Sequence, residues 1–234
     1  MPIETPLQSP LHVISSMATR AVLRELAARC QDATGHTVLT DAAGGVDVAK
    51  RVRAGDAPDL VVLASDVVDK LIGEGHLRPG RVDLVKSGIA VAVRAGAAPP
   101  DIGSEEALRR AVLSAATLSY STGPSGTHLE KTFDRWGVLA AIRDRIVVPP
   151  PGVPVGTLVA DGRAELGFQQ LSELATLPGI EVVGPLPPEV QMLTVFSGGV
   201  AARCDRPEAA RAVLDFMASA AAADAIRRHW MDPA

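Results

Sequence analysis

The sequence predicts an α/β fold of two lobes, each a mainly parallel sheet flanked by helices, joined by two crossing strands. Short β-branched segments alternate with helical patterns, which is typical of parallel sheets with right-handed crossovers. Two long apolar segments lack the usual strand-to-helix turn and are interpreted as the crossings. The 234 residues suffice for two cores, and 47% of them are hydrophobic. Because aromatic residues make up 3%, we expect cores of alanine, valine and leucine.

The predicted strands share short runs of β-branched residues bounded by turn residues. They are Leu11–Ser15, Thr37–Asp41, Asp59–Ala64, Gly88–Val93, Thr117–Ser121, Arg145–Val148, Leu166–Gln169, Glu181–Val183 and Met192–Ala201. Between most of them apolar residues recur at helical spacing, as at Val22, Leu26 and Cys30. Ser104, followed by two glutamates, is a predicted N-cap, and Pro207 opens a long alanine-rich helix.

The lobes are expected to be discontinuous in sequence. The strands at Gly88–Val93 and Met192–Ala201 are flanked by small residues and are assigned as the two crossings. Lobe 1 then comprises residues 1–86 together with 192–234, and lobe 2 comprises residues 87–191. The cluster Pro149-Pro150-Pro151 is expected to be a loop within lobe 2.

Composition argues against several functional classes. The formal net charge is −4 and no block of lysine or arginine stands out, so nucleic acid is not an expected partner. Cys30 and Cys204 lie far apart, without metal-ligand spacing, and are expected to be reduced, buried thiols. No metal, cofactor or membrane insertion is expected. The start, MPIETPLQSP, lacks signal-peptide features, which predicts a cytoplasmic protein, or a periplasmic one if a leader has been removed.

Small and hydroxyl residues gather where predicted strands end and helices begin. In open α/β sheets these junctions carry ligands, because helix N-termini present free N–H groups and a positive dipole end. Together with hydroxyl groups they suit an anion. The candidate binding residues at these junctions are Ser15, Ser16, Thr19, Gly44, Gly45, Ser125, Gly126 and Thr127.

Three further candidates for ligand binding are Ser87, just before the first crossing strand, and the amides of Gln169 and Gln170. Nucleophile-elbow, zincin and Walker motifs are absent. An enzyme would need a group that exchanges a proton with its substrate. The candidates for that catalytic role near the predicted site are His128, Asp41 and Lys86.

Several segments resemble the periplasmic molybdate-binding proteins of ABC importers and their wider type 2 solute-binding relatives. The segments that carry the resemblance are DAAGGVDVAKRVRAGDAPDL at 41–60, VKSGIAVAV at 85–93, YSTGPSG at 120–126, ADGRAELG at 160–167 and the closing helices from Pro207. The resemblance spans nearly the whole chain and implies a two-lobed clamshell. It also implies a small anionic ligand, and a transporter partner if the chain is exported.

The resemblance also implies roles for single residues. In that family hydroxyls and backbone N–H groups hold an oxyanion, and here Ser16 matches the first-loop serine and Ser125 the donor before a later helix. The second-loop serines are replaced by Gly44, Gly45 and Val46, and the family's tyrosine is Gln169 or Gln170. These differences favour a larger, organic anion over molybdate.

Two functions from different classes remain open. The first is capture of a small oxyanion or organic polycarboxylate in a cleft between the lobes. The second follows from a subgroup of the family that includes aconitate isomerase, and is movement of a proton across an allylic tricarboxylate. A ligand-sensing regulator is less favoured, because the chain has no DNA-binding segment.

Overall fold

The computed structural model describes residues 9–150 and 152–234. By Cα proximity they divide into two compact units: unit 1 runs up to Val85 and resumes at Val195–Ala234, and unit 2 is Lys86–Thr194. The sequence expectation placed the same divisions at 86/87 and 191/192. The first eight residues, which hold most of the segment read for a signal peptide, lie outside the described residues, as does Pro151.

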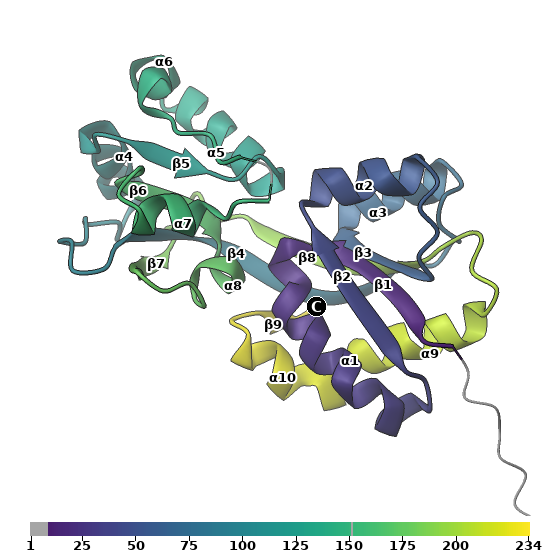
Figure 1. The fold of residues 1–234 in the computed structure, drawn as a ribbon. Helices are drawn as coiled ribbons and strands as arrows, with labels where there is room; N and C mark the ends of the chain where they lie inside the picture. Colours follow the sequence, from purple (N-terminus) through teal and green to yellow (C-terminus); the bar gives the residue numbers. More distant parts are fainter. Residues whose placement is uncertain (1–8, 151) are drawn as a thin grey trace, which may run out of the picture. The chain divides into compact units, whose positions relative to one another are not determined.

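Unit 1 is a sheet covered by helices on both faces. Its elements are β1 Leu11–Ser16, the 3-10 helix η1 Met17–Thr19, α1 Arg20–Thr34, β2 Val38–Ala43, α2 Gly45–Arg53, β3 Leu60–Ala64, α3 Ser65–Gly73, α9 Pro207–Met217, η3 Ala220–Ala222, α10 Ala223–Arg228 and β9 Asp232–Pro233. Helices α1, α9 and α10 cover one face, and α2 and α3 cover the other (Figure 1). The strand order β2-β1-β3 is parallel, and β8 joins β3 antiparallel.

The crossing strands are β4 Val82–Arg94 and β8 Leu193–Val200. The chain leaves unit 1 within β4, between Val85 and Lys86, and returns within β8, between Thr194 and Val195. Strand pairing therefore follows one path through β3, β8, β4 and β6, although the residues group into two separate compact units. Strand β4 begins six residues before the expected Gly88, because Leu84 and Val85 belong to the core of unit 1.

Unit 2 is a smaller sheet, also flanked by helices. Its elements are α4 Glu105–Ser114, β5 Leu118–Tyr120, α5 Pro124–Arg135, α6 Leu139–Ile142, η2 Arg143–Arg145, α7 Val155–Ala160, β6 Leu166–Gln170, α8 Leu171–Leu174 and β7 Ile180–Pro185. Strand β5 is parallel to β6, whereas β4 runs antiparallel to β6 and β7. This sheet is more mixed than alternating strands and helices predict, because the crossing strand opposes both of its neighbours.

Local signals set most helix ends. In α1 the apolar residues of the predicted stripe are buried, and Gly35 ends the helix with φ 75°. Ser104 caps α4 as predicted, because its side chain accepts a hydrogen bond from Ala107 N at 3.2 Å. Gly55, with φ 106°, follows α2 and stops it.

The predicted strand at Arg145–Val148 is wrong. Arg145 ends a short 3-10 helix, and its guanidinium donates to the carbonyls of Leu113 and Ala115 at 2.9 and 2.6 Å. Beyond a single bridge between Leu118 and Ile146, the segment extends no ladder. Proline at positions 149 and 150 has no N–H to donate, so the β-branched run cannot continue as a strand.

The two cores differ in composition. The core of unit 1 is built mainly of valine, leucine and alanine, as the composition predicts, and includes one phenylalanine, Phe196. In unit 2, Phe133 is fully buried, with its ring centroid 5.7 to 6.1 Å from those of Tyr120, Trp136 and Phe168. Aliphatic residues still make up most of the core of unit 2, as predicted, and most of the few aromatic side chains of the chain gather in it.

Candidate functional site

In unit 1 the three parallel strands end at one edge of the sheet. The register pairs Ser16 with Ala43 and Ser15 with Val62, so the last residues of β1, β2 and β3 lie side by side. Helices η1, α2 and α3 all begin at this edge. Their first N–H groups have no partner within the helix, so the edge combines several potential anion donors.

The hydroxyls at the end of β1 are buried and loosely bonded. Ser16 Oγ shares a 3.4 Å hydrogen bond with Thr19 Oγ1, and Thr19 Oγ1 donates to Ser16 O at 3.1 Å. Ser15 Oγ donates to backbone carbonyls of Ser16 and Asp41 at 3.3 and 3.4 Å. Although Ser16 is the N-cap residue of η1, its side chain makes no capping hydrogen bond, and its hydroxyl is instead held by the long bond to Thr19.

Gly44 and Gly45 form the start of α2, beside the first junction. A Cβ added at Gly45 would stand 3.7 Å from Ser16 Cβ, which places this helix start next to the serine. Asp47 lies in the first turn of α2. Its Oδ2 is 3.1 Å from the position that a Cβ would take at Gly44. A carboxylate therefore already faces the positive end of this helix and weakens its attraction for an anion.

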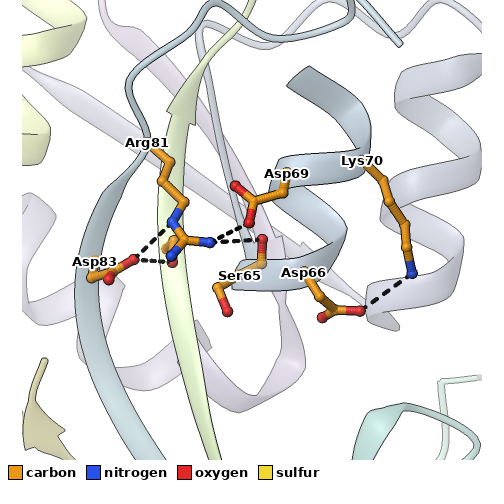
Figure 2. A network of polar contacts seen from close by, with 7 residues as sticks. Ser65, Asp66, Asp69, Lys70, Arg81 and Asp83 are labelled. Carbon is orange, nitrogen blue, oxygen red and sulfur yellow. Dashed lines mark hydrogen bonds and ion pairs between the residues drawn. The ribbon is translucent and has the colours of Figure 1, made fainter. Parts of the chain in front are cut away.

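The start of α3 is held by a charged network (Figure 2). Arg81 Nη1 donates to Ser65 O at 3.3 Å and to Asp69 at 2.5 Å, while its Nε lies 3.2 Å from Asp83. Asp83 also accepts a 2.6 Å hydrogen bond from Ser197 Oγ. Because acidic side chains surround this helix start, the third junction of unit 1 is poorly suited to an anion.

In unit 2 the start of α5 carries no acidic residue in its first turn. Gly123 is the N-cap and Ser125 is buried, with its Oγ 2.7 Å from Ser121 Oγ. A Cβ at Gly126 would stand 1.6 Å from Ser121 O, so the loop closes on the helix at a position that only glycine can occupy. Thr127 bonds back to Gly123 O through its hydroxyl at 3.4 Å.

Gln170 and Ser87 are joined to each other at the unit 2 ends of the crossing strands. The Gln170 amide fits best with its nitrogen donating to Ser87 Oγ and Ser87 O, both at 3.0 Å, while its oxygen accepts from Thr194 Oγ1 at 2.9 Å. All three residues are buried. The structure thus gives these two predicted ligand-binding residues a role in holding β4, β6 and β8 together.

Gln169 connects the start of α7 to an acidic side chain. Its Oε1 accepts from Val155 N at 2.9 Å, and its Nε2 donates to Glu173 Oε2 at 2.6 Å. Burial raises the pKa of Glu173 to about 7, although the hydrogen bond from Gln169 acts in the opposite direction. The sequence reasoning missed Glu173; the available signal was a glutamate inside the apolar segment that follows two glutamines.

The three predicted proton-transfer candidates lie in different surroundings. His128 Nε2 is 2.8 Å from Val190 O, so one ring nitrogen is occupied. Asp41 is exposed, accepts from its neighbour Ala42 N and lies 3.5 Å from Arg51. Lys86 is partly buried in β4, as the first residue of unit 2. Asp41 meets a predicted binding residue only through its backbone carbonyl, which accepts from Ser15 Oγ, and within the described residues no hydrogen bond joins the side chain of any of the three to a predicted binding residue.

Residues 9–150 and 152–234 contain neither a metal-binding cluster nor a helix suited to a membrane. No cluster there of three or more histidine, cysteine, aspartate or glutamate side chains could hold a metal ion. None of the helices described has the length and apolar character required to cross a bilayer.

Two α/β units linked by two crossing strands, with hydroxyls and glycines at helix starts, define a periplasmic-type solute-binding protein. The chain belongs to the family of bacterial extracellular solute-binding proteins, whose model matches residues 11–232. It is similar to an aconitate isomerase from Pseudomonas sp, with 37% identity over 232 residues, covering 95% of this chain and 87% of that protein.

Solved structures show the same fold. The periplasmic molybdate-binding protein of Azotobacter vinelandii matches with a TM-score of 0.75 and 20% identity, over 94% of this chain and 98% of the other. A periplasmic thiamin binding protein matches with a TM-score of 0.78 and 18% identity, over 98% and 84%. Because the ligands in the names of these two proteins differ, the fold alone leaves the ligand of this chain open.

Proposed function

We propose that the chain binds a small organic polycarboxylate through hydroxyl and backbone N–H donors at helix starts of both units. The observation that carries the proposal is the start of α5. There Ser125 and Gly126 are buried, the loop is closed around a required glycine, and the first turn holds no competing acid. Ser16 and Thr19 supply a second set of donors in unit 1. Family membership and the oxyanion ligand in the name of the molybdate-binding neighbour support an anion.

An organic anion is favoured over an inorganic one by the second junction of unit 1. Gly44 and Gly45 bring no side-chain donor there, and Val46 beside them is 48% exposed. An inorganic oxyanion gains from hydroxyl groups on every side, whereas a carbon skeleton gains from an accessible apolar surface. The 37% identical relative is named for an enzyme that acts on aconitate, a tricarboxylate, which supports the same class.

Calorimetric titration tests the binding proposal. The panel contains cis-aconitate, trans-aconitate, citrate, molybdate, sulfate and a neutral sugar. We expect a tricarboxylate to bind more tightly than either inorganic anion, and the sugar not to bind. Ser16→Ala and Ser125→Ala, one in each unit, should each weaken that binding if both units contribute donors. Binding of the sugar or of molybdate in preference to every carboxylate would contradict the proposal.

A second function, isomerisation of the bound tricarboxylate, is favoured by the 37% identity to an aconitate isomerase over nearly the whole chain. The test is incubation with trans-aconitate in deuterated water, followed by proton NMR. Conversion to the cis isomer, or loss of the methylene signal through deuterium exchange, would support the enzyme. Tight binding with neither change after long incubation would leave the binding function and contradict the isomerase.

For the binding function we propose an ABC-type importer as the partner of an exported form of the chain. Membership of an extracellular solute-binding family supports this partner. A candidate importer reconstituted in proteoliposomes should hydrolyse ATP faster when this protein and its anion are both added. Equal ATPase rates with and without the protein would argue against that importer as the partner.

A further inference from the structure

Glu173 stands apart from the other carboxylates of unit 2 by its surroundings. It lies in the first turn of α8, three residues after Gln170, and is only partly accessible. Its Oε2 accepts a 2.6 Å hydrogen bond from a buried amide rather than from an arginine or lysine. A carboxylate placed in this way keeps its basicity, because none of the described residues places a cation beside it.

The amide that holds Glu173 is itself fixed by the backbone. Val155 N–H, which has no partner within α7 because it is the first residue of that helix, donates to Gln169 Oε1 at 2.9 Å. The amide of Gln169 can therefore not rotate without losing this bond, and its nitrogen is directed at Glu173. Helix start, amide and carboxylate form a linear relay, comparable to the way a third group orients a catalytic base.

We propose that Glu173 is the group that removes and returns the proton in an allylic isomerisation, and that Gln169 positions it. The proposal rests on the second function above. Its substrate is a polycarboxylate in which a methylene group adjoins a carbon–carbon double bond. Gln169 is a positioning residue, because it acts through the carboxylate.

The chemical step balances without a further reactant. A carboxylate oxygen of Glu173 takes one methylene proton, and the electron pair of that C–H bond forms a new double bond to the central carbon. The pair of the old double bond moves to the far carbon, which then takes the proton back from the Glu173 carboxylic acid. Proton and double bond have exchanged places, and the geometry of the new bond decides between cis and trans products.

The acidity of Glu173 suits both halves of this cycle. With a pKa of about 7, its base form and its acid form coexist near neutral pH, which is where a group that takes and returns a proton works best. By contrast, Asp41 is paired with Arg51, and one ring nitrogen of His128 is occupied by Val190 O. Geometry and acidity thus select a residue that the sequence reasoning did not name.

Glu173→Gln is the direct test, with Glu189→Gln, an exposed carboxylate of the same unit, as the matched control. Turnover of trans-aconitate and methylene deuterium exchange are followed by NMR. We expect Glu173→Gln to lower both rates by about 10²- to 10⁴-fold, as for loss of a general base, with ligand affinity within about threefold. Glu173→Asp should restore part of the rate, and Glu189→Gln should match the wild type.

Gln169→Leu tests the positioning role. Because the Gln169 hydrogen bond lowers the pKa of Glu173, its removal should move the acidic limb of the kcat–pH profile to higher pH and reduce kcat. A residue with a purely structural role would lower stability without moving that limb. An unmoved limb in a folded, active Gln169→Leu protein would contradict the relay.

The outcomes separate the two levels of the proposal. If the wild type turns over trans-aconitate and folded Glu173→Gln does so at least half as fast, Glu173 is not the base and the isomerase stands. If Asp41→Asn or His128→Ala abolishes turnover while Glu173→Gln retains it, the base is that other residue. If the wild type binds tricarboxylates but exchanges no proton, the isomerase and the role of Glu173 both fail.

Discussion

The two units use different chemistry at their candidate junctions. In unit 1 the polar groups are hydroxyls that bond to one another, and the helix starts of α2 and α3 are faced by Asp47, Asp66 and Asp69. In unit 2 the start of α5 has no acid, and the neighbouring strand ends in amides fixed to backbone groups and to Glu173. The contrast is between hydroxyls held by long hydrogen bonds in unit 1 and, in unit 2, amides held by short hydrogen bonds beside a carboxyl group whose pKa is raised by burial.

The largest expected effect concerns two glycines in first helical turns, Gly126 of α5 in unit 2 and Gly45 of α2 in unit 1. Gly126→Ala sets a Cβ 1.6 Å from Ser121 O, so the loop must move, and we expect a loss of about 3 kcal/mol or more in unfolding free energy. Gly45→Ala sets its Cβ at 3.7 Å from Leu63 and Ser16, an ordinary contact, and should change stability by less than about 1 kcal/mol. Urea unfolding measures the free-energy change of both variants. Equal losses of stability would contradict the inference that the α5 start is more rigid than the α2 start.

The next effect is the pH dependence caused by Glu173. Its pKa in the fold is raised from 4.5 to about 7, so its protonated form stabilises the fold below pH 4.5, and that contribution is lost as pH rises through 7. Glu173→Gln removes this cost and should raise the unfolding free energy by about 2 to 3 kcal/mol at pH 8, and by little at pH 4.5. Thermal melts between pH 4.5 and pH 8 measure this effect. If the melting temperatures of the two proteins differed by the same amount at every pH, the burial of Glu173 would be contradicted.

A smaller effect is expected for Ser16→Ala in unit 1. Loss of one hydroxyl donor should weaken anion binding about tenfold, or about 1.4 kcal/mol, with a change in stability below that value, because the hydrogen bond to Thr19 is long. Ser114→Ala in α4 removes a hydroxyl bonded to a backbone carbonyl outside the candidate junctions and serves as the control. If both variants bind as the wild type does, unit 1 contributes no hydroxyl donor.

The smallest effect sharpens the electrostatic side of the contrast. Asp47→Asn removes the carboxylate that faces the start of α2, so anion affinity should rise two- to threefold, or about 0.5 kcal/mol. Because the group is partly exposed, the gain should fade as salt is raised from low concentration to about 0.5 M. A gain that is independent of salt would point to altered packing rather than charge.

Sequence reasoning succeeded where the signal was local. The N-cap at Ser104 and the buried stripe of Val22, Leu26 and Cys30 depend on residues a few positions away in sequence. It failed where distant segments decide. The surroundings that raise the pKa of Glu173 exist only once α8 has packed onto the fold, and in sequence that glutamate is an ordinary first-turn acid.

Two further differences between the sequence-based expectations and the structure also arise from contacts between segments that are distant in sequence. The predicted ligand-binding role of Gln170 stays a prediction, but the bonds of its amide to Ser87 and Thr194 could not be foreseen, because their proximity depends on the two crossing strands. The segment Arg145–Val148 has β-branched residues and was assigned as a strand, but the arginine and the following prolines hold it in a turn. Propensity is a weak guide where side chains far apart in sequence supply the partners.

The chain's return to unit 1 at Val195 has a consequence for its synthesis on the ribosome. Helix α1 packs against α9 and α10, and Glu25 pairs with Arg228 and His229. About 200 further residues must therefore be synthesised before these partners of the first helix exist. Unit 2 is continuous and can fold first, while the side of α1 that packs against α9 and α10 stays uncovered in the nascent chain. Truncation before α10 should therefore leave unit 1 open to chaperones and proteases, even though every strand of its parallel sheet is already present.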